Sequence, residues 1–182
     1  MPDRWVRTVA LIFVVLGVSA CGGSPVISPV ADASSAASPA AATAALTPAP
    51  SGGATVEEAA AAYLAFVTDW NAAVAVVNDQ FDAAGDDPVK VAAAWAAYVT
   101  VDQAYIAGID AIDFPPSVIG AVQAIRDATD ERIRIEQALA ADPTNLQLVD
   151  EMSAQAGSVA AAGAALRGAL GLPPAVAASP AP

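Results

Sequence analysis

Four aspartates lie close together in the sequence and form the first candidate site: Asp79, Asp82, Asp86 and Asp87. Clustered carboxylates suit a hard cation such as Ca²⁺. Asp79 and Asp82 also fall near the predicted end of a helix, where the helix dipole disfavours negative charge. The spacing does not match an EF-hand, and Asp86 and Asp87 have a simpler role as caps of the next helix. A cation site and a solvated acidic loop are both open, and the spacing favours the loop.

Five aromatic residues form the second candidate site: Tyr63, Trp70, Trp95, Tyr98 and Tyr105. Large rings of this kind can line a pocket for a small apolar ligand. All five also fall on the apolar stripes of predicted helices, which is the pattern of an ordinary core. The spacing favours the core, with the Tyr hydroxyl and Trp N–H groups reaching a partner or the rim.

Composition excludes several classes of active site. The chain has no histidine and one cysteine, so it lacks the residues for a Ser-His-Asp triad, a two-His zinc site or an internal disulfide. Di-iron bundles need Glu-x-x-His motifs, which are likewise absent from the sequence. Seven Lys and Arg against nineteen Asp and Glu give a net charge of −12, which disfavours nucleic acid as a partner. We expect a non-enzymatic protein without a catalytic site or cofactor.

The amino-terminal segment has the pattern of a secretory signal. Arg4 and Arg7 precede an apolar run over residues 9–18, and small residues follow up to Ala20. A membrane-spanning helix needs about 20 apolar residues, and this run is interrupted soon after by Gly, Ser and Pro. The pattern predicts a signal peptide over residues 1–20 that is removed after Ala20.

The last residues of this segment, Val18-Ser19-Ala20-Cys21, resemble the lipobox of bacterial lipoproteins. The resemblance implies that Cys21 becomes the first residue of the mature protein and that its thiol is alkylated by diacylglycerol. A thiolate is a strong nucleophile near neutral pH, and several acyl chains, such as palmitate, anchor a protein stably in a membrane. The Ala- and Pro-rich composition is similar to that of actinobacterial lipoproteins. The implied location is the extracytoplasmic face of the cell membrane.

Two segments have the composition of disordered chain. Residues 21–54 are almost entirely Ser, Ala, Pro, Thr and Gly, and residues 172–182 are similar. Repeated prolines prevent a regular helix, and there is too little bulky apolar surface to offset the entropy of ordering. We expect a disordered linker and a disordered tail on either side of a folded domain over residues 55–171.

The folded domain has the pattern of four helices. Thr55 and Glu58 have the spacing of a capping box, and Gly85 is a typical residue at a helix end. In the first helix, apolar residues recur at alternating steps of four and three: Val56, Ala60, Tyr63, Val67, Trp70, Val74, Val77 and Phe81.

Three further helices follow, and no stretch shows the alternation of a strand. Asp87-Pro88 opens the second helix, the third begins near Ser117, and Asp142-Pro143 opens the fourth. The third helix carries opposite charges four residues apart, which predicts ion pairs on a solvated face: Arg126–Asp130, Asp130–Arg134 and Arg132–Glu136. Short connections between long helices predict an all-α, antiparallel up-down four-helix bundle.

This topology makes a functional prediction. The linker and tail leave at one end, so loops 82–88 and 141–145 lie at the other, facing away from the membrane. Their acidic residues, together with the nearby Glu151, either engage a basic partner or simply keep the protein soluble: Asp82, Asp86, Asp87, Asp142 and Glu151. We expect a membrane-anchored cell-envelope lipoprotein that serves as an interaction or scaffold module for an envelope protein. The alternative is a lipoprotein that binds a small apolar ligand or a cation in or on the bundle.

Overall fold

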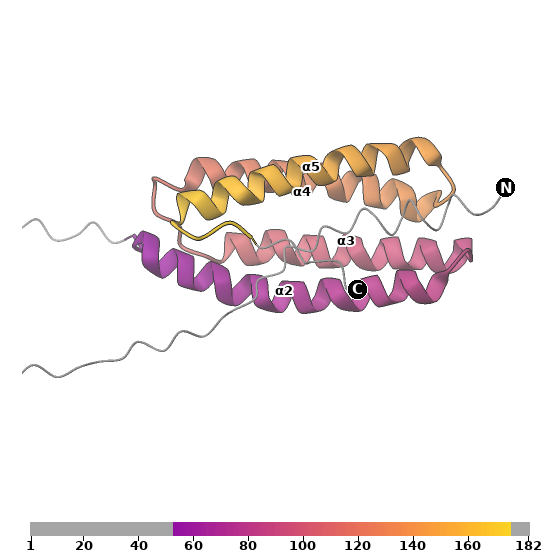
Figure 1. The fold of residues 1–182 in the computed structure, drawn as a ribbon, viewed down its shortest axis with the longest axis horizontal. Helices are drawn as coiled ribbons and strands as arrows, with labels where there is room; N and C mark the ends of the chain where they lie inside the picture. The colour runs from indigo at the N-terminus through magenta and orange to yellow at the C-terminus, as the bar shows by residue number, and fades with distance from the viewer. Residues whose placement is uncertain (1–52, 176–182) are drawn as a thin grey trace, which may run out of the picture.

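The computed structural model describes residues 53–175, which form four α-helices and no strand. The helices are α2 (Val56–Ala84), α3 (Pro88–Asp110), α4 (Ile119–Ala141) and α5 (Leu146–Ala169). Each packs antiparallel against the next one along the chain (Figure 1). The predicted all-α, up-down four-helix bundle is therefore confirmed.

The two ends of the described chain lie at the same end of the bundle. The first turn of α2 and the last turn of α5 are together there, while the α2–α3 turn and the α4–α5 loop are at the opposite end (Figure 1). We call this opposite end, with residues 82–88 and 141–145, the tip. The predicted signal peptide and Cys21, most of the linker and the end of the tail lie outside the described residues.

The ends of α2 and α3 form as the sequence predicts. The backbone N–H of Glu58 donates to Thr55 Oγ1 at 3.2 Å, and the N–H of Thr55 donates to Glu58 Oε2 at 2.8 Å, so the capping box is complete. Gly85 follows α2 with a φ of 54°, which glycine adopts without steric cost. Asp87 caps α3, because its Oδ1 accepts from the N–H of Val89 at 3.0 Å.

The predicted start of the fourth helix at Asp142 is wrong. Asn145 is the N-cap of α5, and its Oδ1 accepts from the N–H groups of Gln147 at 3.1 Å and Leu148 at 3.4 Å. Asp142 Oδ1 instead accepts from the hydroxyl of Thr144 at 2.9 Å and closes a turn. Two capping residues compete within four positions, and the second one caps the helix.

Aromatic rings fill the space between α2 and α3. The ring centre of Tyr105 lies 4.9 Å from that of Trp70 and 5.5 Å from that of Phe66. α3 approaches Phe66 so closely that a Cβ on Gly108 would lie 2.0 Å from the ring atom Cε2. The predicted stripe of α2 is buried apart from Val56, which is partly exposed. Smaller side chains of α4 and α5 complete the core, a division of large and small residues that gives one packed interior.

Candidate functional site

The five candidate pocket aromatics are core residues in the structure. Tyr63, Trp70, Trp95, Tyr98 and Tyr105 are each at most 9% exposed. Tyr63, Trp70 and Tyr105 line an internal cavity of about 10 Å³, which is room for about one water molecule. Trp95 and Tyr98 pack beside each other closer to the tip, with ring centres 6.4 Å apart. This cavity is too small for an organic ligand.

A polar cluster is buried between α3 and α4. Arg132 Nε on α4 donates to Asp102 Oδ2 on α3, and it lies 3.6 Å from Glu136 Oε1 one turn along its own helix. The side chain of Arg132 is 12% exposed, while Asp102 and Glu136 are wholly buried. The Arg132 guanidinium also lies 5.8 Å from the ring centre of Tyr98, the range of a cation–π contact.

The two carboxyl groups of this cluster have strongly perturbed acidity. Burial raises the pKa of Glu136 to about 9, the neighbouring Asp102 carboxyl adds to the rise, and Arg132 opposes it. Burial also raises the pKa of Asp102, although Arg132 and a hydrogen bond with Glu136 pull it down. Neither oxygen of Glu136, nor Asp102 Oδ1, accepts a hydrogen bond from any N–H or hydroxyl group of the described residues. A proton shared between the two adjacent carboxyl groups provides a hydrogen bond between them.

The groups around the pair keep their usual charge at physiological pH. Burial alone would lower the pKa of Arg132, but Asp102, Tyr98 and Glu136 raise it, and the net shift is upward. Burial raises the pKa of Tyr98, against the opposing effect of Arg132. Burial likewise raises the pKa of Tyr105, and the adjacent Tyr63 adds to that rise. The cluster is therefore one guanidinium, one carboxylate and one neutral acid among neutral tyrosines.

Two of the predicted ion pairs of α4 are replaced by others. The pairs of Asp130 with Arg126 and with Arg134 do not form. Arg126 Nη1 instead lies 2.5 Å from Asp110 Oδ1 on α3, and Arg134 Nη2 lies 2.7 Å from Glu131 Oε1. The third pair, between Arg132 and Glu136, does form, but it is buried and not on a solvated face as predicted.

The charge pattern of α4 predicts a solvated face, so it does not reveal the buried cluster. Buried residues of α4 recur at alternating steps of three and four, and polar residues share that stripe: Val122, Ile125, Thr129, Arg132, Glu136 and Leu139, with Arg132 partly exposed. On α3, Asp102 continues the steps from Tyr98 to Tyr105 and is buried with them. Periodicity alone places Asp102, Arg132 and Glu136 on the buried stripes of their helices, but it does not show that these residues pair with one another.

The acidic segment is not gathered into a site. Asp79, Asp82 and Asp86 are exposed, and Asp87 serves as the N-cap of α3. Lys90 Nζ lies 3.8 Å from Asp87 Oδ2. Among residues 53–175, no three His, Cys, Asp or Glu side chains are placed to hold a metal ion. The geometry agrees with a solvated loop and gives the cation hypothesis no ligand cluster.

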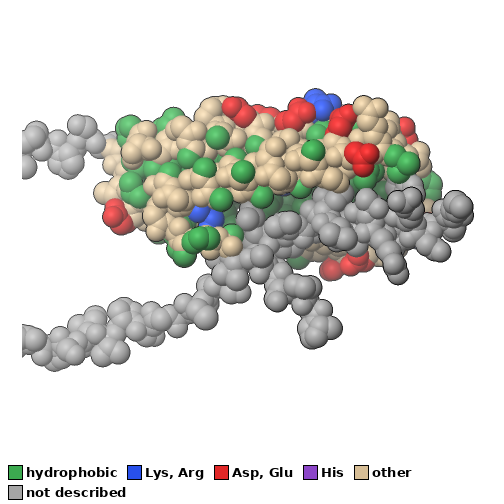
Figure 2. All heavy atoms as spheres, turned by 45° about the horizontal axis from the view of Figure 1, so that its top comes forward, with side chains coloured by type: hydrophobic (Ala, Val, Ile, Leu, Met, Phe, Trp, Pro, Cys, Tyr) green, Lys and Arg blue, Asp and Glu red, His purple; other side chains and the backbone are tan. Residues whose placement is uncertain are grey.

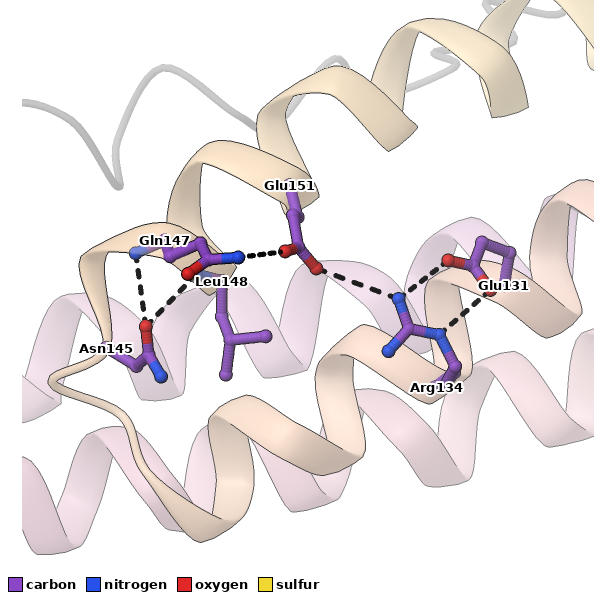
Figure 3. Close-up of polar contacts among 6 residues, drawn as sticks. All are labelled: Glu131, Arg134, Asn145, Gln147, Leu148 and Glu151. Atoms are coloured by element: carbon purple, nitrogen blue, oxygen red, sulfur yellow. Dashed lines mark hydrogen bonds and ion pairs between the residues drawn. The ribbon is translucent and has the colours of Figure 1, made fainter.

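The two loops of the tip lie at one end of the bundle, as the topology predicts (Figure 1). Glu151 on α5 contacts side chains of α5 and α4. Its Oε1 accepts from Gln147 Nε2 at 3.0 Å, and its Oε2 lies 3.7 Å from Arg134 Nη2, which also binds Glu131 (Figure 3). These exposed contacts connect α4 to α5. Of the acidic residues in the tip loops, Asp87 caps α3 and Asp142 accepts from Thr144, while Asp82 and Asp86 are exposed.

The surface carries many acidic side chains and few basic ones, as the face drawn in Figure 2 shows. Within the described part of the chain, α2 is the one helix long and apolar enough to cross a membrane by length and composition. About half of its apolar residues are alanine, and most of its large apolar side chains pack into the bundle, although Val76 is 58% exposed. Core helices of soluble proteins pass the same test, so this finding does not by itself place α2 in a membrane.

The predicted cleavage and lipidation residues, Ala20 and Cys21, lie outside the described residues. Comparison of the whole chain with protein-family models, with curated proteins and with solved structures finds no match.

Proposed function

We propose that this protein is a lipid-anchored component of a bacterial cell envelope and acts as a non-enzymatic interaction or scaffold module. Cys21 carries the lipid, residues 22–54 connect it to the bundle, and the tip meets a protein partner. The charge of −12 makes a basic surface the suitable partner.

The proposed anchor is supported by the order of the amino-terminal features. The features of a lipoprotein signal follow one another in the required order: Arg4 and Arg7, then the apolar run over residues 9–18, then Val18-Ser19-Ala20-Cys21. Cys21 is also the only cysteine of the chain, so it has no intramolecular disulfide partner.

The observation that carries the proposed orientation is the shared end of the bundle. Residue 55 enters the bundle at the end where α5 finishes, and the tip is at the far end of helices of 23 to 29 residues. At about 1.5 Å per residue, those helices separate the entry point from the tip by roughly 35–43 Å. A membrane on the side of residue 55 would leave the tip as the part furthest from the lipid.

The non-enzymatic part of the proposal is supported by what is accessible. Asp102 and Glu136, the two carboxyl groups with raised pKa values among residues 53–175, are wholly buried, which keeps them from contact with a substrate. The exposed carboxylates of the acidic segment belong to no group of three metal-binding side chains among residues 53–175.

Cys21→Ser tests the anchor. The wild-type chain, expressed in a bacterium with lipoprotein processing, is expected in the membrane fraction with residues 1–20 removed and the mass of a diacylglycerol added. Cys21→Ser is expected to lack the added mass. Ser19→Ala keeps a small residue before the cysteine and serves as the matched control, with processing like the wild type. Recovery of the wild type from the cytosol with residues 1–20 intact and a free thiol would refute the anchor.

The partner is tested at the tip. Photo-crosslinkers at Val89 and Leu146, which are 77% and 60% exposed, are expected to capture in intact cells a protein that a crosslinker at Glu57 does not. Asp82→Lys with Asp86→Lys is expected to weaken that capture. Asp87 is left unchanged because it caps α3. Equal capture from both ends, or capture unchanged by charge reversal, would contradict a tip-specific partner.

A further inference from the structure

The cluster between α3 and α4 contains two carboxyl groups but only one positively charged group. Asp102 and Glu136 are both wholly buried, and Arg132 is the only ion-pair partner of either one in the described part of the chain. A single guanidinium neutralises a single carboxylate. A second ionised carboxylate in the same desolvated place would have neither a counter-charge nor water, and this is the arrangement in which two acids retain one proton between them.

The other charged or titratable groups facing this pair do not change that conclusion. From α3 they are Tyr98 and Tyr105, which burial keeps neutral. α2 contributes Tyr63, which contacts Tyr105, and α5 contributes Arg167, whose charge acts on Tyr63 and whose Nε donates to the carbonyl of Pro173. Arg167 forms no ion pair with either acid within residues 53–175. The balance of charge at the interface therefore depends on one proton.

We propose that Asp102 and Glu136 form a proton latch, in which a proton shared between the two carboxyl groups holds α3 against α4 and its loss in alkaline solution loosens that interface. The released proton passes to solvent base, and the cluster then carries two carboxylates against one guanidinium. The repulsion acts between α3 and α4 themselves, because Asp102 is on one helix and Glu136 on the other.

The latch has a signature that this chain makes easy to recognise. The sequence has no histidine, and its one thiol, Cys21, is outside the bundle. Residues 53–175 contain neither His nor Cys, and the other side chains with ordinary pKa values do not titrate between about pH 6 and about pH 9. A change in bundle stability across that range therefore reports the buried pair.

The direction of the change follows from proton linkage. The pKa of Glu136 is about 9 in the folded bundle, against 4.5 for a free glutamate. Between those values the folded state holds one proton more than the unfolded state, so the folded state loses stability as the pH rises. One proton difference changes the unfolding equilibrium constant by about tenfold per pH unit.

The test uses the full chain in mild detergent, unfolded by urea and followed by near-ultraviolet circular dichroism of its Trp and Tyr residues. From pH 6 to pH 8 the unfolding constant of the wild type is expected to rise about 100-fold. Glu136→Gln keeps an N–H donor toward Asp102 and cannot ionise, so its unfolding constant is expected to change less than threefold. Glu131→Gln makes the same substitution at an exposed site on α4 and is the matched control, with the wild-type dependence.

A wild-type unfolding constant that stays level from pH 6 to pH 8 overturns the latch, and so does a Glu136→Gln chain that keeps the wild-type dependence. If Glu136→Gln does not fold, ¹³C NMR of the side-chain carboxyl groups of the wild type decides the question. One carboxyl resonance with a midpoint above pH 8 supports the latch, and midpoints below pH 6 for every carboxyl group overturn it.

Discussion

Replacing Arg132 with leucine removes the only ion-pair partner of two buried carboxyl groups. Asp102 and Glu136 would then lie in the α3–α4 interface without a counter-charge. Breaking a buried ion pair by removing one partner costs about 3–5 kcal/mol, against a total of about 5–15 kcal/mol for a domain. Arg132→Leu is therefore expected to lower the free energy of unfolding at pH 7 by roughly a fifth or more of that total.

Urea unfolding of the full chain measures this loss, and the structure supplies a matched control. Arg134 lies on the same helix and pairs with Glu131, but it is 55% exposed. Arg134→Leu is therefore expected to leave the urea midpoint close to that of the wild type. At pH 4 the cost of Arg132→Leu should shrink, because protonated carboxyl groups no longer need a counter-charge.

The reasoning is refuted if Arg132→Leu costs less than about 1 kcal/mol at pH 7, the range of a surface ion pair, or if its cost is the same at pH 4. Replacing the whole cluster is a different perturbation. With leucine at Asp102, Arg132 and Glu136 together, no charge is left buried, and such replacements are often neutral or stabilising by about 1–4 kcal/mol. The triple variant should therefore be more stable than Arg132→Leu alone.

Three further predictions concern single positions, each measured by thermal or urea unfolding. Thr55→Ala removes the side-chain half of the α2 capping box and should cost about 1 kcal/mol; no loss would mean that the start of α2 is frayed. Gly108→Ala places a Cβ 2.0 Å from Phe66 and should cost about 1–3 kcal/mol, a loss that Phe66→Leu in the same chain should reduce. Asn145→Ala should destabilise the protein by about 1 kcal/mol and more than Asp142→Ala does, and the reverse order would place the start of α5 at Asp142 after all.

The fold was predictable because α2 has an uninterrupted pattern. Its stripe alternates steps of four and three from Ala60 to Phe81, with a capping box before it and Gly85 after it. Each of these signals depends on neighbouring residues only, so the sequence shows them directly. α3 is similarly marked at its start by Asp87 followed by proline.

The buried cluster was not predictable by the same reasoning, because its stability is not local. Arg132 and Glu136 have the spacing of a solvated pair on one helix, and only the approach of Asp102 from α3 makes their burial acceptable. A charged residue on an apolar stripe can be assigned to the core only when its partner on another helix is known. The sequence contains the spacing but not the pairing.

The predicted start of α5 is wrong for a different reason. Asp142 and Asn145 are both good capping residues, and the proline after Asp142 fits the first position of a helix. The choice depends on how much chain is needed to connect the end of α4 with the start of α5. That distance is a property of the packed bundle, and the composition of the loop does not reveal it.

The shared end of the bundle also determines how the protein would bear mechanical load. A pull between residue 55 and the α2–α3 turn would run along α2 alone. A pull on the α4–α5 loop would have to pass sideways from α2 to α3 and then to α4, because α2 and α5 share no comparable set of contacts among the described residues. The second path shears the seam that contains Asp102 and Arg132. Tension would therefore reach the Asp102–Arg132 pair if the partner binds the α4–α5 loop, but not if it binds the α2–α3 turn.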